Sequence, residues 1–100
     1  MPGKEDMRQS ITLNIRYDIP EDEWQKIDTV YRSMDGWFDS QDVSRWYGMK
    51  DAPRHILASV EPGGILFEGE MESALWTGWL TVLCARLTMA LGREVHDVEM

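Results

Sequence analysis

ALWTGWLTVLCARLTMALG, residues 74–92, is the stretch that decides how this chain folds. It contains one charged residue, Arg86, and none of the 18 acidic residues of a chain whose formal net charge is -8. A segment this apolar must be buried in a domain core, against a partner subunit or in a bilayer. Its length suits a membrane span, but Arg86, three threonines and the lack of a flanking Lys/Arg cluster argue against one.

At 100° per residue, this stretch forms a helix with two different sides. One side is bulky and suits packing on a sheet; it consists of Trp76, Trp79, Leu80, Leu83, Leu87, Ala90 and Leu91. The other side is small and uncharged; it consists of Thr77, Gly78, Thr81, Cys84, Ala85 and Thr88. A solvent-facing side usually carries charges, so we expect a second contact. Either a homodimer through the helix 73–91 or burial within the chain would provide it, and an acid paired with Arg86 would favour the dimer.

Outward from this helix, four further elements follow from periodicity. Residues 11–19 alternate apolar and polar side chains, which predicts a strand, and residues 21–34 show helical spacing after Pro20. Residues 55–60 and 65–71 predict two strands of a hairpin, because a Pro-Gly-Gly turn separates them.

Weaker signals complete the order of elements. Residues 40–47 predict a short helix with a polar start and Gly48 at its end, and residues 94–99 predict a final strand. The order β-α-(short α)-β-β-α-β predicts an α+β fold of the ferredoxin-like split β-α-β type. Such a sandwich has a four-stranded antiparallel sheet with two main helices on one face, here with a short extra helix. We expect residues 1–9 to form a flexible N-terminal tail and residues 10–100 a single α+β domain.

Composition narrows the classes of partner that this protein could bind. A sequence pI of about 4.6 argues against nucleic acid and against an anionic membrane surface, but suits a basic protein partner. One cysteine, Cys84, and a polar N-terminus favour a cytoplasmic location. His55 and His96 are expected on the two outer strands, far apart, so neither a metal site nor a cofactor is predicted.

Residues 35–47, DGWFDSQDVSRWY, concentrate acids and aromatic rings. Carboxylate pairs beside aromatic rings are typical of carbohydrate-cleaving sites, but no distant acid completes a pair here, so no catalytic residue is assigned. Trp, Tyr and Arg are the side chains that most often anchor protein interfaces. The expected partner-binding residues are Trp37, Phe38, Asp39, Asp42, Arg45, Trp46 and Tyr47.

We therefore expect a small acidic protein-binding protein without catalysis, an adaptor or an immunity-like protein that neutralises a basic partner. The alternative is a small-molecule sensor or a small dimeric ferredoxin-like enzyme with a pocket between sheet and helices. That pocket would be lined by Tyr17, Trp24, His55, Trp76, Trp79 and Arg86. A purely structural subunit of a larger assembly is a third hypothesis.

Overall fold

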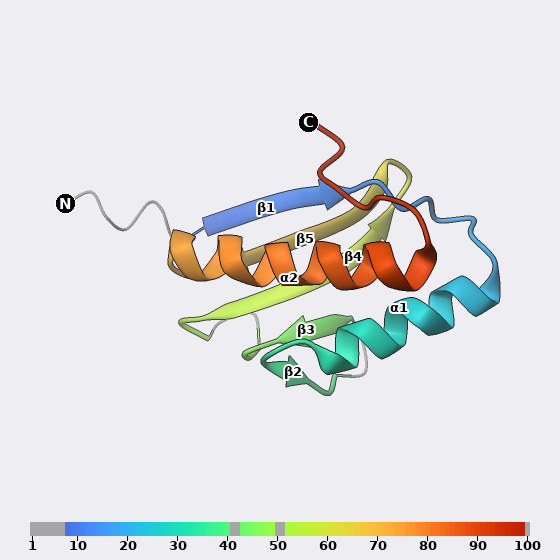
Figure 1. Cartoon of the computed structure of the whole chain (residues 1–100). Coiled ribbons are helices and arrows are strands. Elements are labelled where there is room, and N and C mark those ends of the chain that lie inside the picture. Colours follow the sequence, from blue (N-terminus) through green and yellow to red (C-terminus); the bar gives the residue numbers. More distant parts are fainter. Residues whose placement is uncertain (1–7, 41–42, 50–51, 100) are drawn as a thin grey trace.

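One antiparallel sheet of five strands organises the chain (Figure 1). This computed structural model describes residues 8–40, 43–49 and 52–99. The strands are β1 (Arg8–Leu13), β2 (Trp37–Phe38), β3 (Ser44–Trp46), β4 (His55–Glu61) and β5 (Gly64–Glu70). Their order across the sheet is β1-β5-β4-β3-β2. Because β1 and β2 form opposite edges, the chain crosses the whole sheet between them.

Two helices, α1 (Glu21–Ser33) and α2 (Ser73–Leu91), lie on the same face of the sheet and contact each other (Figure 1). Helix α1 begins after Pro20 with three acids in its first turn, where the helix dipole favours negative charge. Helix α2 ends at Gly92, which adopts the left-handed conformation at φ 72°. Both long helices, the 61–64 hairpin turn and the α+β class are confirmed.

Trp46 of β3 lies at the centre of the core. It is fully buried, and its ring centroid lies 5.0 Å from that of Tyr31 in α1 and 4.9 Å from that of Trp79 in α2. The Trp46 indole N–H donates to the Tyr31 carbonyl oxygen at 3.0 Å. Phe67 of β5 lies 6.0 Å from both the Tyr31 and Trp46 rings. A short strand near the sheet edge is therefore held to both helices and to the sheet centre.

The predicted short helix at 40–47 is wrong, because strand β3 occupies residues 44–46 and pairs with β2. Trp37 lies opposite Trp46, with ring centroids 5.7 Å apart. Tyr47 then takes a left-handed φ of 73° and donates its backbone N–H to the Gly36 carbonyl at 2.7 Å. Extended chain places Trp46 in the core and Arg45 on the opposite sheet face, which one helical turn would not do. The sheet consequently has five strands, with no ferredoxin-like order.

The predicted first strand is shorter and begins earlier, and the predicted last strand over 94–99 does not form. Strand β1 runs from Arg8 to Leu13 rather than over 11–19, and only a single bridge, Leu13 to Asp97, forms where a last strand was expected at 94–99. The Asn14 backbone N–H donates to the His96 carbonyl at 3.0 Å, next to this bridge. Of the predicted tail, residues 8 and 9 belong to β1, and residues 1–7 lie outside the described residues.

Candidate functional site

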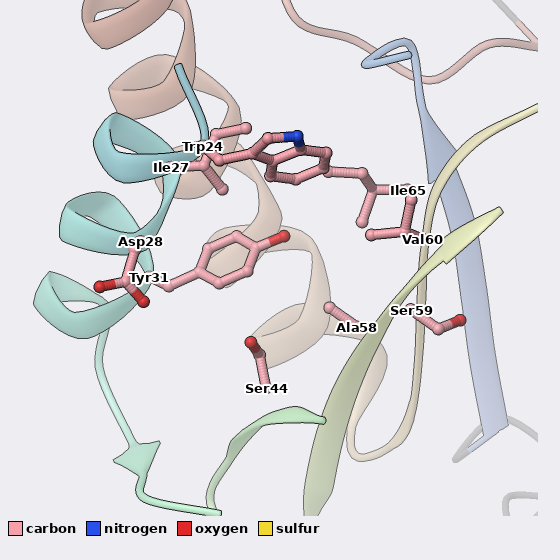
Figure 2. A pocket seen from close by; sticks show the side chains of 9 residues that line it. All are labelled: Trp24, Ile27, Asp28, Tyr31, Ser44, Ala58, Ser59, Val60 and Ile65. Atoms are coloured by element: carbon pink, nitrogen blue, oxygen red, sulfur yellow. The ribbon is translucent and has the colours of Figure 1, made fainter. Parts of the chain in front are cut away.

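A cleft of about 250 Å³ opens between α1 and the sheet (Figure 2). Helix α1 provides one wall, and strands β3, β4 and β5 provide the other. Its lining residues are Trp24, Ile27, Asp28, Tyr31, Ser44, Ala58, Ser59, Val60 and Ile65. Most of the wall is apolar, with a few polar groups, the usual composition of a binding site in proteins.

The cleft follows from spacing on α1 and from small residues on the sheet. Trp24, Asp28 and Tyr31 are four and three residues apart, so they share one side of the helix. On the sheet, Ser44 and Ala58 are paired in register and belong to the face that the helices cover. Because neither side chain is long, the sheet does not fill the space beside the larger α1 side chains.

Tyr31 supplies a buried polar group to the cleft. Its side chain is 7% exposed, and Figure 2 shows the hydroxyl directed into the space between α1 and β4. Burial, with the nearby Asp28 charge as a smaller cause, raises the pKa of Tyr31 well above its ordinary value. No hydrogen bond to this hydroxyl occurs within the described part of the chain. At neutral pH it is therefore a protonated phenol that can both donate to and accept from a ligand.

Two side chains border the mouth. The Trp24 ring extends from α1 toward Ile65 and Val60 and closes one end of the cleft (Figure 2). The Asp28 carboxylate accepts from Arg32 Nε through Oδ2 at 2.9 Å. Its Oδ1 makes no bond to any other described residue. The mouth therefore combines the face of an aromatic ring with a carboxylate whose second oxygen has no hydrogen-bond partner among the described residues.

Two other hollows lie elsewhere on the surface. One groove of about 420 Å³ runs between α2 and residues 33–35 and includes Trp79 and Arg86. Another hollow of about 830 Å³ lies on the sheet face away from the helices and includes His55. The His55 ring Nδ1 lies 3.2 Å from the Ala52 carbonyl oxygen.

The structure does not bring the six predicted pocket residues together. Trp24 lines the cleft, Trp79 and Arg86 line the groove beside α2, and His55 lines the opposite sheet face. Trp76 is a buried residue of α2, and Tyr17 is an exposed loop residue.

The predicted partner-binding segment divides between core and surface. Trp46 and Arg45 are buried, so neither presents its side chain to a partner. Trp37 and Tyr47 are half-buried, whereas Phe38 and Asp39 are exposed. Asp42 lies outside the described residues. Of the expected partner-binding residues that the structure describes, only Phe38 and Asp39 are therefore exposed to a partner.

Sequence reasoning identified Trp24 but missed Tyr31, Asp28 and the small strand residues. A spacing of seven from Trp24 to Tyr31 was visible, but it equally predicts two core side chains. Among the residues that the structure describes, no three His, Cys, Asp or Glu side chains are grouped so that they could hold a metal ion.

Comparison with protein-family models, with curated proteins and with solved structures finds no match to this chain.

Proposed function

We propose that this protein binds another protein without catalysis, and that the cleft between α1 and the sheet receives one basic side chain of that partner. The observation that carries this proposal is the composition of the cleft mouth: an aromatic face, a carboxylate and a buried phenol on a chain of net charge -8. An adaptor, or a protein that neutralises a basic partner, would use such a site.

The cleft suits an arginine or lysine side chain in three ways. Its apolar walls can cover the alkyl stem while the charged head stays near water. The Trp24 and Tyr31 rings can stack against the cation, and the Asp28 oxygen that Arg32 leaves free can accept a hydrogen bond from it. The overall negative charge would also speed the encounter with a basic surface.

A short-peptide titration tests this proposal. We expect acetyl-Gly-Arg-Gly-amide to shift the NMR signals of the Trp24 indole and the Asp28 amide, with weaker shifts at high salt. The neutral isostere acetyl-Gly-citrulline-Gly-amide should shift them much less. Equal responses to the two peptides, or shifts spread over all acidic surfaces, would exclude a basic side chain as the anchor.

A matched pair of variants distinguishes binding in the cleft from attraction to the negative charge of the whole chain. Asp28→Asn should weaken the response to the arginine peptide, whereas Asp22→Asn, an exposed acid on α1 outside the cleft, should leave it unchanged. Equal loss in the two variants would indicate non-specific attraction. A photocrosslinker at Val60, on the cleft wall, would then capture the natural partner from its cells.

A second candidate function is the binding of a small neutral molecule in the same cleft. The Tyr31 hydroxyl favours it, because a polar group between apolar walls orients small ligands. At about 250 Å³ the cleft would hold a compact ligand. A neutral compound that raises the Tm of the wild type but not of Tyr31→Phe would favour this function over peptide binding.

A further inference from the structure

Helix α2 presents a long apolar face to solvent. Leu75, Val82 and Met89 are 37%, 41% and 84% exposed, and they follow one another at intervals of seven residues. Ala74, Gly78 and Ala85 lie among them and are also exposed. By length and composition alone this helix could span a membrane. Only 28% of its apolar stretch is buried inside the molecule, so much of the helix is left uncovered. Proteins in water seldom expose an uncharged helix face of this extent, so we expect a partner to cover it.

The spacing along this face is symmetric. Val82 lies midway between Leu75 and Met89, and each interval of seven residues covers two turns, about 10.5 Å. A two-fold axis perpendicular to α2 at Val82 would therefore pair two copies antiparallel. Leu75 of one copy would then meet Met89 of the other, and the two Val82 side chains would meet each other. Such self-complementarity is what an isologous dimer requires.

Two charges beside this face fit the same symmetry. Arg86 lies four residues after Val82, and Trp79, three residues before it, donates its indole N–H to the Asp35 carbonyl at 3.0 Å. Arg86 and Asp35 line the same groove along one side of α2. A two-fold axis at Val82 would therefore bring Arg86 of one copy to the level of Asp35 in the other.

Neither of these charges has an ion-pair partner among the described residues. Arg86 Nη1 donates to the Ser33 carbonyl at 3.0 Å and to the Ser33 hydroxyl at 3.1 Å, both neutral groups. The Asp35 carboxylate accepts from the Tyr47 hydroxyl at 3.2 Å. Both side chains are thus held near the groove with their charge uncompensated, and pairing across a dimer would compensate both.

We propose that two copies of this chain associate through antiparallel α2 helices, with Val82 at the two-fold axis and reciprocal Arg86–Asp35 ion pairs. Two chains of net charge -8 repel each other, so they need a contact face with few acids, and α2 itself carries none. A bilayer is a poorer occupant. The other side of α2 carries Trp76, Leu83 and Leu87 into the core, so the helix would have to leave the sheet to span a membrane.

Cysteine crosslinking tests the orientation. In a Cys84→Ser background, Val82→Cys should form a disulfide-linked dimer under mild oxidation, and so should the double variant Leu75→Cys/Met89→Cys. Leu75→Cys alone should not, because antiparallel packing separates the two copies of residue 75. Val60→Cys, at an exposed position on β4 away from α2, is the control. A dimer from Leu75→Cys alone would overturn the antiparallel arrangement.

Sedimentation of the unmodified protein tests the contact and its charges. We expect a concentration-dependent monomer–dimer equilibrium that Arg86→Glu weakens about tenfold or more. The charge exchange Arg86→Glu/Asp35→Arg should restore it, and far-UV circular dichroism should show that each variant is folded. A wild type that stays monomeric up to about 0.5 mM would overturn the proposal. So would flotation of the protein with phosphatidylcholine vesicles, which would identify lipid as the occupant.

Discussion

The Trp46 side chain joins three parts of the molecule. Its ring contacts aromatic residues of α1 and α2, and its indole N–H satisfies the Tyr31 carbonyl near the end of α1. We expect Trp46→Phe to reduce the free energy of unfolding by about 3 kcal/mol, because it leaves a cavity and removes a buried hydrogen bond. Urea denaturation followed by circular dichroism measures this.

Trp37 provides the matched control for that prediction. It packs against Trp46 from β2 but is only half-buried. Trp37→Phe should therefore cost about 1 kcal/mol or less. Similar costs for the two substitutions would show that Trp46 is not the central contact of the core.

Cys84, on α2, is the second residue whose environment predicts a measurable property. Partial burial raises the pKa of this thiol, and the Asp97 charge adds to the shift. A raised pKa leaves less thiolate at any given pH, so iodoacetamide should alkylate Cys84 more slowly in the folded chain than in urea. The midpoint of the rate against pH should be higher in the folded chain, and Asp97→Asn should lower it. A folded-state midpoint at or below that of the unfolded chain would contradict this.

Elements with a local signal could be predicted from the sequence, whereas those that depend on distant partners could not. Helix α2 and the β4–β5 hairpin are encoded by continuous periodicity and by turn residues next to them. Strand β3 is three residues long. It forms because Trp46 is buried in the core and pairs with Trp37 and Ile56 on the neighbouring strands. Its own sequence resembles a helix start, so no local pattern could have revealed it.

The candidate site shows the same division. Trp24 could be proposed from its type and its place on an amphipathic helix. The cleft itself arises where Ser44 and Ala58 are paired across β3 and β4, and that register is set by the unexpected strand. Similarly, the burial of Trp46 and Arg45 follows from β3 and could not be foreseen from a helical interpretation.

Within the sheet, Gly69 of β5 allows two strands to approach closely. A Cβ atom there would overlap the His55 carbonyl oxygen and lie 3.1 Å from the Ile56 Cα. Because these are backbone atoms, they cannot rotate away. We expect Gly69→Ala to cost about 3 kcal/mol in the free energy of unfolding.

Gly63, in the adjoining turn, is the control for Gly69. A Cβ atom at Gly63 would meet nothing within 4 Å. Gly63→Ala should therefore change the free energy of unfolding by about 0.5 kcal/mol or less. Thermal denaturation of both variants compares them, and equal Tm values would show that β4 and β5 are not packed as closely as described.

On the scale of the whole molecule, the C-terminal segment covers part of an exposed sheet edge. Val98 donates its backbone N–H to the Thr12 carbonyl at 2.9 Å, next to the bridge between Leu13 and Asp97. An uncovered edge strand can pair with other chains, so we expect this segment to limit aggregation at β1. The opposite edge, β2, is only two residues long, and a strand that short offers little for another chain to pair with.

Asn14 is the residue that fastens this segment. Its side chain accepts from the His96 backbone N–H at 2.8 Å and donates to the Glu94 carbonyl at 3.1 Å. We expect Asn14→Ala to speed amide hydrogen exchange at residues 96 and 98 about tenfold, while the free energy of unfolding falls by only about 1–2 kcal/mol. Ser10→Ala, at an exposed position of β1, is the control. If exchange at these amides is unchanged, then buried Val95, whose N–H bonds to the Thr88 hydroxyl at 3.0 Å, holds the segment without Asn14.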